Sequence, residues 1–250
     1  MQEPLVTVIT VCYNAESLIE ETIQSVLNQD YKNLEYLIVD GASKDGTMSV
    51  VQKYADRLTY VSEPDKGIYD AMNKGLGIVR QKMQKDGTLE CWVNFMNAGD
   101  TFADSSVLCK VFCNRTISSK VKVVVGATYD VYTDHRVLRS LAPVSEISMY
   151  IPFCHQSSFT RMPIDKAWTF DTTYRLAADY NLFYEIWENY GLEAFLPLDI
   201  PIACYRMEGS TSYVNIRRTE KECLRIRSRH RDREWWKDAV KWILSGLRLR

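Results

Sequence analysis

The chain has 250 residues, of which 46% are hydrophobic and 25% charged, and its formal net charge is -1. This composition is typical of a soluble globular protein. It contains no apolar run near the roughly 20 residues that a membrane-spanning helix needs, and its first residues lack the pattern of a secretory signal. We therefore expect a cytoplasmic protein with one sizeable α/β domain or two small ones.

The charges are unevenly distributed along the chain. Residues 217–250 carry 12 basic and 5 acidic side chains, whereas residues 1–216 carry 19 basic and 27 acidic ones. The seven cysteines form an odd set without a C-x-x-C pair. The sequence thus predicts reduced, mostly buried thiols, and neither a disulfide framework nor a zinc site.

Strand and helix patterns alternate through the first half, which is typical of β-α-β units. Strands are predicted at 5–11, 34–39, 58–61 and 91–96. Helices are predicted from a capping box at Ser17, at 47–55, at 68–82 despite Gly75 and Gly77, and after a cap at Ser105 or Ser106. We expect these units to form a mostly parallel sheet.

The second half is less regular. Its apolar patterns predict a strand at 121–132, an irregular or extended segment at 136–150, an aromatic-rich helix at 176–190, short apolar runs at 194–198 and 200–204, and a basic helix from residue 215. We expect a catalytic domain at 1–213, with halves 1–104 and 105–213, and a helical appendage at 214–250.

Three acidic loops directly follow predicted strands in the first half, at 40–47, 63–67 and 97–100. In an open parallel sheet such loops meet beyond the carboxyl ends of the strands, where α/β proteins bind ligands. Carboxylates gathered there suit sugar hydroxyls, a nucleobase edge or a divalent cation that bridges phosphates. The loops therefore predict a ligand site at this edge.

Several motifs in order resemble the family 2 glycosyltransferases, which are inverting enzymes of the GT-A fold with a nucleotide-sugar donor. They are VITVCYN at 8–14, SVLNQ at 25–29, IVDGASKDGT at 38–47 and SEPDKGIYDAMNKG at 62–75. The resemblance runs from Val6 to about Asp179 and is similar to the branch that builds bacterial O-antigen and other surface polysaccharides. It implies a Rossmann-like α/β fold, transfer of one sugar per encounter, and a saccharide acceptor attached to undecaprenyl diphosphate.

The resemblance assigns the first two acidic loops to the nucleotide of the donor, for which UDP is expected. Tyr13 would lie against the base, and Asp40 would accept a hydrogen bond from a uracil imide or a ribose hydroxyl. Asp65 would bind the nucleoside or cap the helix that follows. Met72 stands where some relatives carry a basic residue, so Lys66 or Lys74 is expected to supply the positive charge.

The third loop, Asn97-Ala98-Gly99-Asp100, takes the place of the family's Asp-x-Asp metal motif without its first carboxylate. Asp100 would be the main protein ligand of Mn²⁺ or Mg²⁺ between the donor phosphates, where the cation neutralises the leaving diphosphate. An Asx-type turn is the alternative. Asn97 is expected beside the donor sugar or the acceptor.

The acceptor side is expected in the second half. His155 and Gln156 resemble a segment that lines the sugar pocket, where His155 would bind the sugar, help to hold the metal or serve only the fold. An inverting transfer needs a carboxylate that takes the proton of the attacking hydroxyl. Asp179 is the predicted base and Asp171 the alternative, with a helix cap as the structural explanation for either.

The basic tail also carries apolar side chains at helical spacing: Trp235, Trp236, Val240, Ile243, Leu244 and Leu247. This pattern suits an interfacial helix on an anionic membrane, which would hold the protein on the inner face of the cytoplasmic membrane. The alternative is a helix docked on the catalytic domain with a solvated basic face.

Two other functions are compatible with parts of the sequence. A nucleotidyltransferase shares the general architecture, but it would need a glycine-rich basic loop where the chain has Cys12-Tyr13-Asn14-Ala15. A nucleic-acid-binding protein could use the basic tail, but the acidic body opposes such a partner. We therefore expect no nucleic-acid partner.

Overall fold

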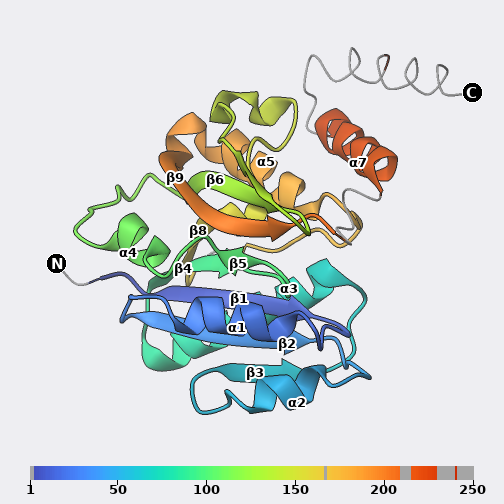
Figure 1. Ribbon diagram of the computed structural model, residues 1–250. Coiled ribbons are helices and arrows are strands. Elements are labelled where there is room, and N and C mark those ends of the chain that lie inside the picture. The colour runs from blue at the N-terminus through green and yellow to red at the C-terminus, as the bar shows by residue number, and fades with distance from the viewer. Residues whose placement is uncertain (1–2, 166–167, 209–214, 230–239, 241–250) are drawn as a thin grey trace, which may run out of the picture.

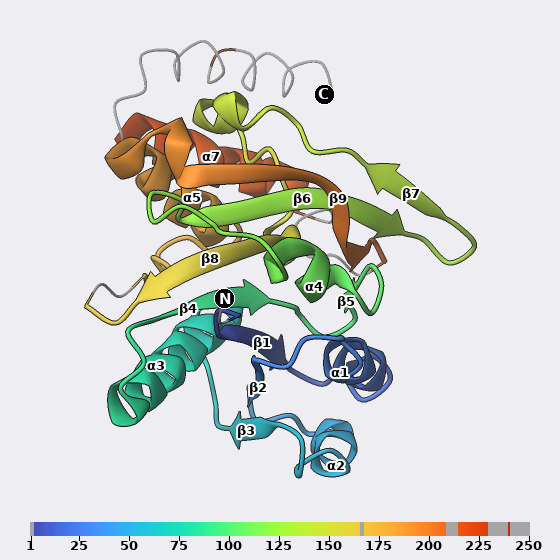
Figure 2. The ribbon, with the colours of Figure 1, turned by 90° about the vertical axis from the view of Figure 1, so that its left-hand side faces the viewer.

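The computed structural model describes residues 3–165, 168–208, 215–229 and 240 of the chain. In this part of the chain, nine strands form a single mixed sheet with the order β3-β2-β1-β4-β8-β6-β9-β5 (Figure 1), and β7, outside this order, pairs with β6 (Figure 2). None of the described helices is long and apolar enough to cross a membrane.

The first half is the parallel part of the sheet. Its elements are β1 (Val6–Cys12), α1 (Ile19–Leu27), β2 (Leu34–Asp40), α2 (Thr47–Gln52), β3 (Thr59–Ser62), α3 (Ile68–Asp86) and β4 (Glu90–Phe95). β1 pairs in parallel with both β2 and β4, and β2 pairs in parallel with β3. The predicted alternation of strands and helices is confirmed, and the loops after these strands share one edge of the sheet.

The second half extends the sheet in mixed orientation. Its elements are β5 (Thr101–Phe102), α4 (Val107–Phe112), β6 (Val123–Val131), β7 (Arg136–Arg139), η1 (Val144–Ser148), η2 (His155–Ser157), β8 (Ser158–Pro163), α5 (Ala178–Tyr190), η3 (Leu192–Ala194), β9 (Phe195–Arg206) and α7 (Ile216–Arg229). β8 is antiparallel to both β4 and β6, and so joins the two halves. β9 runs parallel to β6.

The sheet has a hydrophobic core on each face, because the side chains of β1 alternate between the two faces. Ile9 and Val11 belong to the core that contains α3 and α5. Val6 and Val8 belong to the core that contains α1, α2 and α4. Figure 2 shows α3 and α1 on opposite sides of β1.

A glycine allows α3 to pack closely on β1. A Cβ atom at Gly75 would lie 2.8 Å from Cγ2 of Ile9, whereas a Cβ atom at Gly77 would have no neighbour within 4 Å. Gly75 is therefore a packing residue inside the helix, and it does not end the helix as glycine often does.

The predicted helix caps differ from those in the structure. The residue before α1 is Leu18, and no side chain caps this helix. Ser17 is therefore not a capping residue. The backbone amides of Leu18 and Ile19 donate instead to the carbonyl of Ala15. Ser106 precedes α4, but the amide of Leu108 donates to Oε1 of Gln29.

One further prediction needs correction. Cys109 and Cys113 form a disulfide at the end of α4, so the prediction of reduced thiols is wrong for this pair. The two apolar runs around Pro201 belong to one strand, β9. The register of this strand against β6 shifts beside the proline, and the pairing continues on both sides of the shift. Gly126 of β6 lies at that shift, and a Cβ atom there would be 2.6 Å from the carbonyl oxygen of Ile200.

Candidate active site

Two of the predicted nucleoside residues lie together at the carboxyl edge of the parallel strands. A side chain at Gly41 would collide with Oδ2 of Asp65 and approach the ring of Tyr13, so these three residues are in close contact. The Tyr13 ring is 61% exposed. Oδ1 of Asp65 accepts the Gly67 amide at 2.8 Å, while Oδ2 has no hydrogen-bond partner in the described part of the chain. Asp65 thus caps the turn with one oxygen and keeps the other available.

The side chain of Asp40, which is predicted to contact the nucleoside, is fully buried. Oδ2 accepts the amide of Ser43 at 3.0 Å and the hydroxyl of Ser62 at 2.6 Å. Oδ1 accepts the hydroxyl of Ser43 and the thiol of Cys12. Burial, together with the Asp40 charge, raises the pKa of that thiol. Asp40 therefore ties together the ends of β1, β2 and β3.

The 97–100 turn is anchored on α1. Gly99, with a φ of 99°, donates its amide to the hydroxyl of Thr22 at 2.9 Å, and that hydroxyl donates to the Asp100 carbonyl at 2.8 Å. The side chain of Asp100 accepts the amide of Arg206 at 2.9 Å and Nε2 of Gln156 at 2.7 Å. Burial raises the pKa of Asp100 to about 6 even though both hydrogen bonds oppose it.

Asp179, in the first turn of α5, is the centre of a second cluster. Its Oδ1 accepts the Tyr69 hydroxyl at 3.0 Å and the Tyr180 amide at 2.9 Å, and its Oδ2 lies 3.1 Å from Nδ1 of His155. Burial raises the pKa of Asp179, but interactions with His155 and the other donors outweigh this effect and hold it below its usual value. The carboxylate is therefore ionised at neutral pH.

His155 connects the two clusters. Its Nε2 lies 3.2 Å from Nδ2 of Asn97, in the same turn as Asp100. Both contacts are satisfied when Nδ1 donates to Asp179 and Nε2 accepts from Nδ2 of Asn97. The structure thus links Asn97, His155 and Asp179 by consecutive side-chain contacts. Gln156, which follows His155 in the sequence, donates a hydrogen bond to Asp100.

A divalent cation fits this turn with few protein ligands. Oδ1 of Asn97 is buried without a hydrogen-bond partner among the described residues, and the Asp100 carboxylate beside it is buried, which raises its pKa. The described residues contain no group of three or more His, Cys, Asp and Glu side chains placed to hold a metal. A cation held by Asp100 and Asn97 would therefore need phosphate and water oxygens, as Mg²⁺ commonly does.

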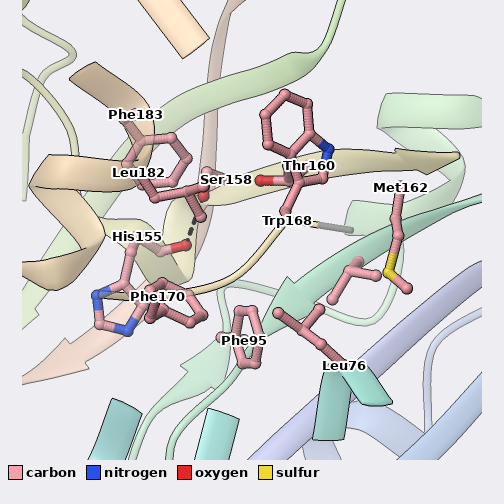
Figure 3. Close-up of a pocket in the computed structure, with 11 residues that line it drawn as sticks. Leu76, Phe95, His155, Ser158, Thr160, Met162, Trp168, Phe170, Leu182 and Phe183 are labelled. Atoms are coloured by element: carbon pink, nitrogen blue, oxygen red, sulfur yellow. Dashed lines mark hydrogen bonds between the residues drawn. The ribbon is translucent and has the colours of Figure 1, made fainter. Parts of the chain in front are cut away.

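Two hollows adjoin the cluster. The smaller, of about 20 Å³, is an apolar cavity between Phe95, His155 and Phe170 (Figure 3). It has room for about one water molecule, so no sugar fits there. The larger is an open groove of about 1180 Å³ between the start of α3, residues 172–176 and α7, with Tyr69 in its wall. We refer to it as the α7 groove.

α7 is docked beside the helix that carries Asp179 (Figure 1). The carboxylate of Glu222 accepts the amides of Arg175, Leu176 and Ala177 at 2.8–3.0 Å. Arg229 pairs with Asp171 at 2.9 Å, so the alternative base is already in an ion pair. Residues 216–229 thus form a helix docked on the rest of the protein, which was the alternative to a membrane-bound helix. The apolar residues predicted to face a membrane lie outside the described part of the chain, except Val240.

Three residues of this site were not predicted from the sequence. Tyr69 lies within the 62–75 motif, which by itself predicts no role for this residue. Arg206 acts through its backbone amide, and Glu222 lies in the segment predicted to form a basic helix. The signal for Tyr69 was its place in the motif, whereas the other two contacts have no local signal.

Comparison with known proteins agrees with these features. The sequence profile described as glycosyl transferase family 2 matches residues 7–166. The chain therefore belongs to glycosyltransferase family 2, and the predicted family is confirmed.

Among curated relatives, a glycosyltransferase of Rickettsia prowazekii is 25% identical over 193 residues, which cover 73% of this chain and 58% of the relative. TuaG of Bacillus subtilis, a glycosyltransferase named for teichuronic acid biosynthesis, is 40% identical over 80 residues, or 32% of this chain and 30% of TuaG. The chain thus spans about half or less of the length of these two relatives.

Solved structures share the fold. The mannosyltransferase PcManGT of Pyrobaculum calidifontis, in complex with GDP-Man and Mn²⁺, matches with a TM-score of 0.63 at 20% identity, over 90% of this chain and 64% of that one. Residues 1–349 of S. aureus TarS in complex with UDP match with a TM-score of 0.59 at 16% identity, over 92% and 72%. The predicted GT-A fold is confirmed.

Proposed function

We propose that the chain moves one sugar, with inversion, from a nucleotide-diphosphate sugar to a saccharide acceptor. The observation that carries this proposal is the contact of the Asp179 carboxylate with His155, whose other ring nitrogen contacts Asn97 in the turn that also contains Asp100. A base beside a phosphate-binding turn is what such a displacement requires. UDP is our preferred nucleotide, supported by the UDP complex of a protein with the same fold.

Each residue has a separate part in the proposed reaction. Tyr13 and Asp65 bind the nucleoside, and Asn97 and Asp100 hold the divalent cation. When bound, that cation neutralises charge on the leaving diphosphate. Asp179 accepts the proton of the acceptor hydroxyl. The oxygen of that hydroxyl bonds to the anomeric carbon, and the bond between this carbon and the diphosphate breaks on the opposite face.

The remaining predicted residues have supporting parts. His155 and the Tyr69 hydroxyl orient the base and hold it ionised, as their contacts with Asp179 support. Gln156 orients Asp100, to which it donates a hydrogen bond. Lys66, which lines the α7 groove, supplies positive charge beside the reacting groups.

We further propose that the acceptor is linked to a lipid diphosphate and that the product is a bacterial surface polysaccharide. The relative named for teichuronic acid biosynthesis supports this class of product. The basic tail at 217–250 would then hold the enzyme at an anionic membrane surface, where such an acceptor resides.

Asp179→Asn tests the proposed base. We expect transfer to fall by a factor on the order of 10³, because the amide cannot take the proton, while nucleotide affinity stays within about twofold of the parent in calorimetry. Asp171→Asn is the matched control and should retain transfer. If the Asp179 variant transfers sugar normally, or if only the Asp171 variant is inactive, the base is misassigned.

A further inference from the structure

The α7 groove lies next to the proposed base but outside the nucleoside cluster. It is bounded by residues 66–70, residues 172–176 and α7. Tyr69 forms part of its wall, and the hydroxyl of this tyrosine donates to Asp179. A molecule in the groove therefore has one end close to the site of proton transfer.

The groove is rich in positive charge. Five cationic side chains line it: Lys66, Arg175, Arg218, Lys221 and Arg225. The two acidic residues in the lining are Asp70, whose Oδ2 accepts the Lys66 amide, and Glu222, whose oxygens accept three backbone amides. Both carboxylates thus already have hydrogen-bond partners, and cations outnumber them.

None of the five cations has an ion-pair partner among the described residues. Arg225 donates a hydrogen bond to Thr173, and its guanidinium carbon lies 4.3 Å from the centre of the Tyr174 ring. Lys66, Arg175, Arg218 and Lys221 make no such side-chain contact in this part of the chain. Since residues 1–216 carry a net negative charge, this positive groove is a local feature that concentrates anions.

Arginine and lysine side chains gathered in this way suit phosphate oxygens in particular. The guanidinium group can bind two oxygens at once, and the ammonium group adds a mobile point charge. The groove is larger than one phosphate group needs, so its volume also accommodates the group that the phosphate carries.

We propose that the α7 groove binds a phosphate or diphosphate group of the acceptor. Arg218 and Lys221 of α7 would hold this group while the acceptor hydroxyl faces Asp179. This inference rests on the proposed glycosyl transfer and adds to it a location, on α7, for an anionic part of the acceptor.

The test measures binding without turnover. Inorganic pyrophosphate is titrated into the full chain by calorimetry in the presence of saturating UDP, so that the donor pocket is already filled. The double variant Arg218→Gln/Lys221→Gln should weaken pyrophosphate binding about tenfold or more. Arg217→Gln, which removes an exposed cation of the same helix outside the groove, should leave it unchanged. Equal binding by all three proteins would overturn the proposal.

Two further arms identify the source of the phosphate. Farnesyl diphosphate should bind more tightly than farnesol, and the double variant should lose this difference. If instead only binding to phosphatidylglycerol vesicles, compared with phosphatidylcholine vesicles, depends on the two side chains, the groove serves membrane headgroups and the acceptor proposal is wrong.

UDP affinity distinguishes this proposal from the proposed function. The double variant should bind UDP as the parent does, and a clear loss would place the two cations in the donor pocket and contradict the acceptor site. Pyrophosphate binding needs no proton transfer. If Asp179→Asn still transfers sugar, the proposed role of Asp179 is wrong, but the pyrophosphate titration still tests the α7 groove.

Discussion

Two carboxylates of the site, the buried Asp100 and the partly exposed Asp179, have opposite pKa shifts. Asp100 receives hydrogen bonds from a backbone amide and a glutamine amide, and burial raises its pKa to about 6. Asp179 receives three hydrogen bonds at the start of a helix, one of them from His155, and its pKa is lowered. The first residue is thus suited to receive a cation and the second to remain an anion.

This difference predicts how donor binding depends on pH. A group with a raised pKa is protonated below that value, so Asp100 should lose its charge as the pH falls through about 6. Mn²⁺-dependent UDP affinity should then fall by about tenfold per pH unit below that point. Calorimetry between pH 5 and 7.5 measures it. Asp100→Asn should bind weakly with a flat profile, and a flat profile in the parent would exclude Asp100 as the ligand.

At the scale of elements, α7 holds the segment that leads into α5. Glu222, Arg225 and Arg229 all contact residues 171–177, immediately before Asp179. The carboxylate of Glu222 lies at the amino end of α5, where an anion is favoured. The position of the proposed base, Asp179, therefore depends on a helix from the far end of the chain.

Glu222→Ala should loosen the contact between α7 and the segment that leads into α5. Loss of the carboxylate leaves three amides without their acceptor, which should lower the free energy of unfolding by about 1–3 kcal/mol. Misplacement of the base should reduce kcat by tenfold to a hundredfold, on the order expected for a shift of about 1 Å, with little change in the KM for the donor. Glu220→Ala, on the exposed side of α7, is the control. Glu222→Gln should restore part of the rate, and unchanged kinetics in Glu222→Ala would refute the positioning role.

The packing of α3 on β1 gives a second prediction at this scale. Gly75→Ala adds a methyl group 2.8 Å from Ile9 and should destabilise the protein by about 1–3 kcal/mol. Gly77→Ala adds the same group where no atom lies within 4 Å and should stabilise the helix by about 0.5–1 kcal/mol. Urea unfolding of the pair measures both effects, and equal midpoints would show that close packing at residue 75 is unimportant.

At the scale of the whole molecule, the predicted halves share one sheet. β8 hydrogen-bonds to β4 of the first half and β6 of the second. β5 pairs with β9, although Thr101 and its partner Cys204 are 103 residues apart in the sequence. The active site is built across this junction, since Tyr69 and Asn97 come from the first half and His155 and Asp179 from the second.

The basic tail predicts behaviour of the entire protein at a membrane. The full chain should sediment with liposomes that contain anionic lipid, and a chain that lacks residues 232–250 should bind them much more weakly, by about 1 kcal/mol for each basic residue lost near the surface. Neutral liposomes are the control. Equal sedimentation of the two proteins would rule out the tail as the membrane contact.

The sequence alone determined the features that depend on local patterns. The alternation of apolar runs and helical periodicity located the parallel strands, and the motifs after those strands identified the family and the loops around Tyr13, Asp65 and Asp100. These signals lie within short segments, because side-chain periodicity and turn residues act over a few positions.

The tertiary structure decided which of these side chains are exposed and which are buried in the fold. Asp40 had the same local signal as Asp65, but the convergence of three strands buries it among Ser43, Ser62 and Cys12. The Tyr69 contact with Asp179 spans 110 residues, and Glu222 reaches its amides across 45–47 residues. Contacts of this range depend on how helices and strands pack together, for which no short stretch of sequence carries a signal.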